Sequence, residues 1–208
     1  MSCRFHWGTS KVFMISHEHK CIFIHIPKCA GESVETALMG RPNWEKDDPN
    51  YKSLGLPPDS NIGEDKHYTL AQWKENENFN NYFKFSIVRN PWAATYSFYK
   101  YRKKRDNFPH KFNSWVECVN PNLWKGFLSP FKYLKIGNDM PVDHIAKFEN
   151  LDIEWAYICG RLGMPNQPLP LRNQTGYNDE YRSHYNQKSI EYVYSKLSEE
   201  INFFHYEF

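Results

Sequence analysis

Residues 21–40 read CIFIHIPKCAGESVETALMG and combine a strand, a turn and a helix in one unit. The apolar, β-branched run at 22–26 predicts a buried strand, which Pro27 ends. Small residues follow as a turn, and apolar residues then recur at helical spacing up to Gly40, where we expect the helix to end. Such a turn directs backbone N–H groups and a helix N-terminus at one point, and Lys28 stands beside it. The stretch therefore predicts a binding site for phosphate or a similar anion.

A second strand, turn and helix follow further along the chain. The run FKFSIV at 83–88 predicts another buried strand, and Asn90 and Pro91 supply the N-cap and first-turn proline that favour a helix start. Arg89 stands at the junction, and Ser97 lies within the helix. A guanidinium fork and a hydroxyl suit a phosphate. Two separate phosphate sites suggest a ligand that carries phosphates at distant positions.

The order of elements predicts the fold class. A third strand is expected at 144–148, and a helix begins at Asn150 and ends at Gly163. Strands that alternate with helices favour an α/β layered fold with a largely parallel sheet. In such sheets ligands bind beyond the carboxyl ends of the strands, where Lys28 and Arg89 both stand. The last helix is expected to bury one apolar stripe, made of Ile190, Val193, Tyr194, Leu197 and Ile201.

The bulk composition is that of an ordinary globular protein. The chain has 208 residues, 40% of them hydrophobic and 24% charged, which predicts a single domain over 1–208 with its core at about 20–208. A net charge of +2 gives no sign of a nucleic-acid partner. Five cysteines without a C-x-x-C pair favour reduced thiols in the cytoplasm. We expect a soluble protein, because the sequence shows neither a signal peptide nor a stretch of about 18 apolar residues.

Two local features leave alternatives open. A Walker-type nucleotide loop needs G-x-x-x-x-G-K-[ST], whereas Lys28 here precedes Gly31, and no other match exists in the chain. This argues against a standard ATP or GTP hydrolase, and an ordinary strand-to-helix turn with an incidental lysine stays an alternative. A run of cations closes the second helix and is either a solvated helix end or a contact for an anionic substrate. It consists of Lys100, Arg102, Lys103, Lys104 and Arg105.

The segment IFIHIPKCAGES, followed by FSIVRNPWAATYSFY, resembles the paired donor-binding motifs of carbohydrate-type sulfotransferases, family 2. These enzymes use 3′-phosphoadenosine-5′-phosphosulfate (PAPS), and their motifs read approximately PKTAGTS and RNPxxRxxSxY. The resemblance continues through IAKFENL, GRLGMP, LRNQTG and the last helix, so it covers about residues 20–208. It implies a P-loop-like three-layer sandwich, in which helices flank a central, mainly parallel sheet.

The resemblance also implies roles for individual residues. Those that would hold the 5′-phosphosulfate are Lys28, Cys29, Ala30, Gly31, Glu32 and Ser33. Arg89 and Ser97 would hold the 3′-phosphate, and Arg172 and Thr175 lie in a loop expected near the adenosine, or in an ordinary polar loop. Lys28 would also stabilise charge on the leaving oxygen during in-line transfer to a hydroxyl acceptor, which we expect to be a saccharide. The donor supplies the reactive group, so this chemistry needs no metal.

Three residues depart from the family pattern. Cys29 and Glu32 replace threonines, and Ala94 replaces a common arginine. A carboxylate beside a phosphate is repulsive, so we expect Glu32 to point away and Ser33 and the backbone amides to hold the donor. The departures leave open an inactive module that binds 3′,5′-bisphosphoadenosine (PAP) or sulfated glycans. A nucleotide kinase-like phosphotransferase is a further alternative, although the missing Walker motif counts against it.

The reaction also needs a base that takes the proton of the acceptor hydroxyl, and histidine suits this role near neutral pH. His67 is the candidate, because KHYTLAQW resembles the family segment that carries a catalytic histidine. A helix-capping or surface histidine is the alternative for this position. Glu64 or Asp65 could orient His67, whereas His25 lies in a buried strand and is expected to be a satisfied core residue.

Overall fold

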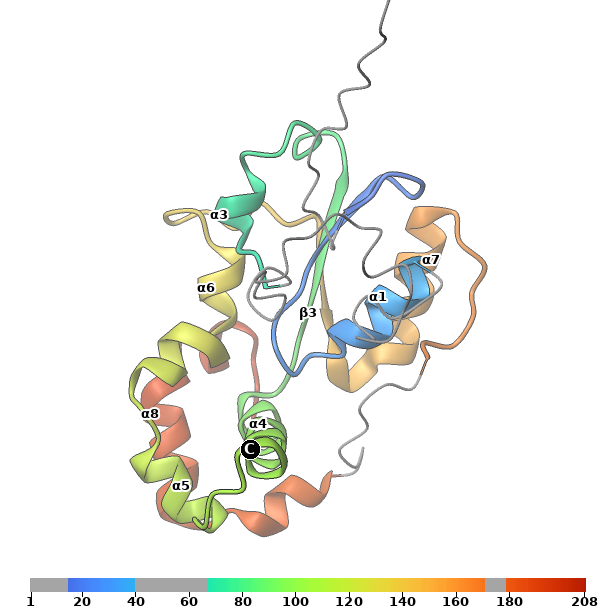
Figure 1. Ribbon diagram of the computed structural model, residues 1–208. Coiled ribbons are helices and arrows are strands. Elements are labelled where there is room, and N and C mark those ends of the chain that lie inside the picture. Colours follow the sequence, from blue (N-terminus) through green and yellow to red (C-terminus); the bar gives the residue numbers. More distant parts are fainter. Residues whose placement is uncertain (1–14, 40–66, 171–178) are drawn as a thin grey trace, which may run out of the picture.

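The computed structural model describes residues 15–39, 67–170 and 179–208 (Figure 1). A four-stranded sheet with the order β1-β2-β3-β4 forms its centre. Its strands are β1 (Ile15–Ser16), β2 (Cys21–Ile24), β3 (Phe83–Val88) and β4 (His144–Lys147). β1 pairs antiparallel with β2, while β2, β3 and β4 run parallel to one another. The predicted α/β class with a largely parallel sheet is thus confirmed.

The register of β2 against β3 brings the two predicted anion loops together. Ile24 pairs with Ser86, and the Ser86 hydroxyl donates a 2.7 Å hydrogen bond to the carbonyl oxygen of Ile24. Since the two strands are parallel, both end at the same edge of the sheet. Lys28 and Arg89, which follow these strands, therefore lie at that edge.

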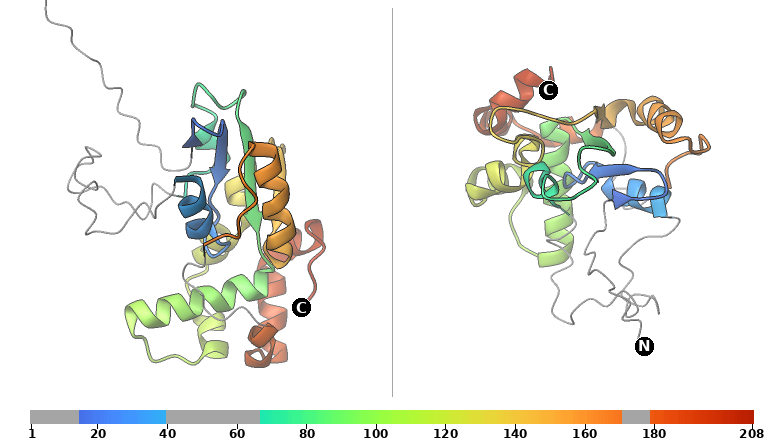
Figure 2. Two further views of the ribbon diagram at one scale, coloured as in Figure 1. Left: turned by 90° about the vertical axis from the view of Figure 1, so that its right-hand side faces the viewer. Right: turned by 90° about the horizontal axis from the view of Figure 1, so that it is seen from above.

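The helices surround the sheet in two groups. They are α1 (Gly31–Met39), α3 (Leu70–Trp73), α4 (Pro91–Asp106), α5 (Phe112–Cys118), α6 (Pro130–Leu134), α7 (Leu151–Leu162) and α8 (Gln187–Phe203), with short turns at η2 (Trp124–Leu128), η3 (Phe148–Asn150) and η4 (Asp179–His184). α1 and α7 lie on opposite sides of the sheet (Figure 2). α4, α5 and α8 lie beyond the carboxyl ends of the strands (Figure 1). The anion loops are therefore at the junction of the two groups.

The hydrophobic core is likewise divided into two clusters, one at the sheet and one among the helices beyond its carboxyl edge. All four residues of β2 are fully buried, as expected for a central parallel strand that is covered on both faces. A second cluster packs α4, α5 and α8 together and includes Phe98, Trp115 and Val193. Val193, Leu197 and Ile201 of the predicted α8 stripe are buried, but Tyr194 is 44% exposed, so the stripe prediction is wrong at that position.

Local signals explain most of the helix ends. The Asn90 side chain accepts hydrogen bonds from the N–H groups of Trp92 and Ala93, which confirms the predicted N-cap of α4. Gly163 adopts a left-handed conformation and ends α7 as predicted. Asn150 occupies the N-cap position of α7, which confirms the predicted start of this helix, and its side chain makes no capping hydrogen bond.

α8 ends in a left-handed residue that is not glycine. His205 has φ of 53°, the N–H of Tyr206 donates to Ile201 O at 2.9 Å, and the N–H of His205 donates to Asn202 O at 3.3 Å. This is the Schellman arrangement, in which glycine is usual at the left-handed position. The His205 side chain therefore imposes a conformational cost on the end of α8.

We expect His205→Gly to raise the free energy of unfolding by about 1 kcal/mol, because a Cβ in the left-handed region costs roughly 1–2 kcal/mol. Gly163→Ala is the matched opposite change, since a Cβ there meets nothing within 4 Å and only the backbone strain is added. It should lower the stability by about 1 kcal/mol. Urea unfolding measures both variants, and a less stable His205→Gly protein would contradict the prediction.

Candidate functional site

The loop between β2 and α1 has a backbone suited to an anion. Lys28 and Ala30 have φ of 66° and 61°, and Cys29 between them lies outside the left-handed region. Left-handed residues that alternate with residues of negative φ can turn successive N–H groups toward one concavity. The N–H groups of Ser33 and Val34 donate to Ala30 O at 3.0 and 3.2 Å, so the first turn of α1 begins directly at this loop. This geometry fits the predicted role of residues 28–33, although binding itself stays a prediction.

Gly31 begins α1 directly against the ring of His25. A Cβ at position 31 would lie 1.9 Å from Nε2 of His25, so glycine is required here by close contact. The other ring nitrogen of His25, Nδ1, lies 2.5 Å from Oε1 of Glu35 on α1. Both side chains are buried, at 4% and 1% exposure. His25 is therefore a hydrogen-bonded buried residue, as predicted, and its partner Glu35 is one that the sequence interpretation missed.

The thiol of Cys29 faces the protein and not a ligand. Cys29 is buried, and its Sγ lies 3.5 Å from Pro27 O. Burial raises the pKa of the Cys29 thiol to about 12, so the sulfur is protonated and unreactive at neutral pH. Any contribution of Cys29 to binding an anion therefore comes from its backbone N–H.

Arg89 joins the two predicted phosphate sites. Its Nη1 donates a 3.2 Å hydrogen bond to the carbonyl oxygen of Lys28, which is 61 residues earlier in the chain. Its guanidinium carbon lies 4.1 Å from the ring centroid of Phe148. Stacking on an aromatic ring fixes the plane of a guanidinium. The end of β3 and the loop after β2 thus form one continuous cationic region.

α4 presents one face to the same loop. Ser97, Tyr101 and Arg105 recur at intervals of four residues and therefore share a helix face. Nζ of Lys28 lies 4.6 Å from the ring centroid of Tyr101, a contact that no sequence pattern predicted. Ser97, one turn before Tyr101, is 4% exposed. Lys28 and the helix that carries Ser97 are thus in direct contact.

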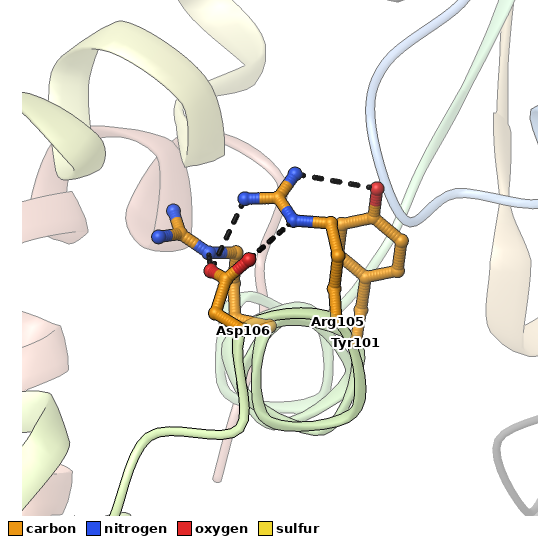
Figure 3. Close-up of polar contacts among 4 residues, drawn as sticks. Tyr101, Arg105 and Asp106 are labelled. Carbon is orange, nitrogen blue, oxygen red and sulfur yellow. Dashed lines mark hydrogen bonds and ion pairs between the residues drawn. The ribbon is translucent and has the colours of Figure 1, made fainter.

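At the cationic end of α4, the carboxylate of Asp106 accepts hydrogen bonds from two arginines. Nε of Arg105 donates to Asp106 Oδ1 at 2.6 Å, and Nη1 of Arg105 lies 3.5 Å from the Tyr101 hydroxyl (Figure 3). Nε of Arg102 also donates to Asp106. The hydrogen bonds from Arg105 and then Arg102 lower the pKa of the Asp106 carboxyl to about 2. The run of cations lies on the last turns of α4, at the helix end where it was predicted.

His67 is held by a backbone carbonyl. Its Nδ1 lies 3.0 Å from the carbonyl oxygen of His25, and because a carbonyl only accepts, Nδ1 carries the proton. Nε2 is then the basic nitrogen of the ring. The His67 ring packs edge-on against those of His25, Phe127 and Tyr133, with centroids 4.5, 6.1 and 6.5 Å away. This tautomer suits the predicted base, whose catalytic role stays a prediction.

Several predictions fall outside the described residues. These are Arg172 and Thr175 near the donor, and Glu64 and Asp65 beside His67. Within residues 15–39, 67–170 and 179–208, no group of three or more His, Cys, Asp or Glu side chains is placed to hold a metal ion. None of the helices in these ranges is both long and apolar enough to cross a membrane.

Comparison with known proteins decides the family. Residues 11–207 match the family described as the sulfotransferase family. This chain belongs to the sulfotransferase family. The chain is also 32% identical over 108 residues to an uncharacterized protein of Archaeoglobus fulgidus, an alignment that covers 50% of this chain and 86% of that protein. No solved structure matches the chain. The resemblance found in the two motifs is confirmed, and the family match covers nearly the whole chain.

Proposed function

We propose that this sulfotransferase moves a sulfuryl group from PAPS to a hydroxyl group of a saccharide. The observation that carries the proposal is the hydrogen bond from Arg89 to Lys28 O, because it unites two cationic loops at the carboxyl edge of the sheet. A donor with phosphates at its 3′ and 5′ positions needs such a pair of sites. The placement of α1 and α7 on opposite faces of the sheet supports the P-loop-like three-layer sandwich implied by the resemblance.

PAPS, when bound, supplies an activated sulfuryl group on a phosphosulfate anhydride. The N–H groups of residues 28–33 and the Lys28 ammonium hold its 5′ end, while the Arg89 guanidinium and the Ser97 hydroxyl hold its 3′-phosphate. Lys28 stabilises the negative charge that develops on the leaving phosphate oxygen. The contact of the Lys28 ammonium with the Tyr101 ring helps to hold Lys28 at this end of the site.

His67 takes the proton of the acceptor hydroxyl at Nε2. In the neutral ring, the hydrogen bond from Nδ1 to His25 O leaves the lone pair on Nε2, and it also fixes the orientation of the ring. The packing of the ring against Phe127 and Tyr133 restricts its rotation. A general base held in this way contributes roughly 10²- to 10⁴-fold to a rate.

The experiment compares the wild-type protein with His67→Gln. Both should show the same rise in melting temperature with PAP, because His67 takes no part in holding the donor. Consumption of labelled PAPS across a panel of saccharide acceptors should fall about 100-fold or more in His67→Gln.

The outcomes distinguish the proposed function from its two alternatives. No thermal shift of the wild type with millimolar PAP contradicts the proposal. PAP binding without consumption of PAPS by the wild type indicates an inactive binding module, which the replacement of two family threonines by Cys29 and Glu32 favours. A shift with ATP and Mg²⁺ in place of PAP indicates a phosphotransferase.

A further inference from the structure

The short turn η2 has π-helical geometry and carries Phe127 beside the candidate base. The N–H of Ser129 donates to Trp124 O at 2.9 Å, five residues earlier in the chain. A π turn closes this hydrogen bond over one residue more than an α-helix does, and such turns are rare and frequent at functional sites. The chain thus departs from ordinary helix geometry in the segment that contacts the His67 ring.

The packing of η2 against α8 fixes the turn. Trp124 is 1% exposed, and its ring centroid lies 5.9 Å from that of Tyr192 on α8. The buried hydroxyl of Ser129, directly after η2, donates a hydrogen bond to the buried carboxylate of Glu200 on α8. A buried polar pair of this kind is costly to break. Phe127 therefore has a defined position in the fold.

Phe127 connects the helices beyond the sheet edge to the candidate base. Its ring centroid lies 4.6 Å from that of Phe98 on α4 and 6.1 Å from that of His67. The Tyr133 hydroxyl donates a 3.3 Å hydrogen bond to the carbonyl oxygen of Phe127. Both the ring and the backbone of Phe127 are thus held in place next to His67.

Exposure distinguishes Phe127 from the other rings that pack on His67 in the described part of the chain. The rings of His25 and Tyr133 also contact His67, but these residues are only 4% and 1% exposed. Phe127 and His67 are both half-buried. An acceptor that brings a hydroxyl to His67 can therefore touch the Phe127 ring, whereas the other two rings are covered.

A sugar in its ring form offers a suitable surface to such a side chain. The C–H groups on one side of a pyranose form an apolar face, and its packing on an aromatic ring removes apolar area from water. Aromatic walls with a few polar groups are typical of small-molecule sites. An open-chain polyol carries similar hydroxyl groups but lacks this rigid apolar face.

We propose that Phe127 is a specificity-determining residue of the acceptor site: its ring packs against the C–H face of a pyranose and brings one sugar hydroxyl to His67. The inference rests on the proposed function, since it places the acceptor hydroxyl at His67. It narrows the acceptor to sugars in the ring form.

The test measures initial rates with labelled PAPS and four acceptors: methyl β-galactoside, methyl β-glucoside, methyl α-mannoside and the open-chain galactitol. For the preferred glycoside, Phe127→Leu should raise KM about tenfold and change kcat by less than about twofold, because it removes a binding contact. For galactitol, kcat/KM should change by less than about twofold. Phe127→Tyr keeps an aromatic ring and should hold KM within about twofold of the wild type.

Phe131→Leu is the matched control. Phe131 on α6 is also half-buried, and its ring packs on those of Phe203 and Phe204, with centroids 5.3 and 5.9 Å away. It should leave the KM of the glycoside within about twofold of the wild type. Calorimetric titration of the glycoside into the PAP-loaded protein gives a second measure, in which only Phe127→Leu should weaken binding about tenfold.

Each other outcome overturns a stated part. An unchanged KM in Phe127→Leu, an equal rise in Phe131→Leu or an equal loss with galactitol overturns the role of Phe127. A fall in kcat at constant KM also overturns it, because Phe127 would then support His67 without contacting the acceptor. A wild-type protein that consumes no PAPS and binds none of the glycosides overturns the proposed function instead.

Discussion

Replacement of Glu35 by alanine is expected to lower the free energy of unfolding by about 3–5 kcal/mol, because it breaks a buried polar pair by removing one partner. Glu35 and His25 are 1% and 4% exposed, and their side chains lie 2.5 Å apart. With alanine at position 35, Nδ1 of His25 stays buried but loses this acceptor. A cavity also opens beside α1, where the Glu35 side chain was. Few single substitutions in this chain should cost as much.

Urea unfolding, followed by tryptophan fluorescence, measures the loss. Glu35→Gln keeps a hydrogen-bond acceptor in the same place and should cost less than Glu35→Ala. Glu199→Ala is a control on the exposed side of α8 and should change the stability by no more than about 0.5 kcal/mol. A loss below about 1 kcal/mol in Glu35→Ala would show that the buried pair is not stabilising the fold.

We expect the loss of Glu35 to disturb the anion loop and His67 as well. The His25 ring packs on Gly31 at the start of the anion loop, and the His25 carbonyl holds His67. Movement of His25 therefore displaces the loop backbone and the base together. Variants at Glu35 that still fold should bind PAP more weakly than the wild type.

Arg89→Ala is expected to weaken PAP binding by at least about 100-fold, equivalent to nearly 3 kcal/mol. The substitution removes the forked donor for the 3′-phosphate, the hydrogen bond to Lys28 O and the stacking on Phe148. AMP binding should fall much less, because AMP lacks the 3′-phosphate. Calorimetric titration of both ligands gives the two ratios.

The matched control for Arg89 is Arg161→Ala. Arg161 on α7 stacks over Phe83 at the opposite end of β3, with 5.1 Å between its guanidinium carbon and the ring centroid. It carries the same charge and makes the same kind of aromatic contact, so PAP affinity should stay within about twofold of the wild type. Equal losses in the two variants would mean that net charge, and not the Arg89 site, governs binding.

Much of the fold could be predicted because its signals are local. The strand at 83–88, the cap at Asn90 and the end of α7 at Gly163 each depend on residues within a few positions of one another. The exceptions are also instructive. Tyr194 stands at an apolar spacing but faces solvent, because helical periodicity does not say how wide a face the neighbouring helices cover.

The site was predictable only in part. Its two motifs identify Lys28 and Arg89, because each follows a recognisable strand. The contacts of Glu35 with His25 and of Tyr206 with Glu149 could not be predicted, since they join side chains from elements that only packing brings together. The sequence did hold one signal that pointed to a partner such as Glu35. It is the histidine in the predicted apolar strand, because a buried imidazole requires a polar partner.

The amino-acid sequence by itself determined the order of strands and helices, the family and the two cationic junctions, because short-range steric and capping preferences act between neighbouring residues. Tertiary structure alone decided which side chains meet. The parallel register of β2 and β3 puts Lys28 and Arg89 at one edge, and the return of the tail after α8 brings Tyr206 to Glu149. Such contacts depend on the packing of whole elements, which no local spacing encodes.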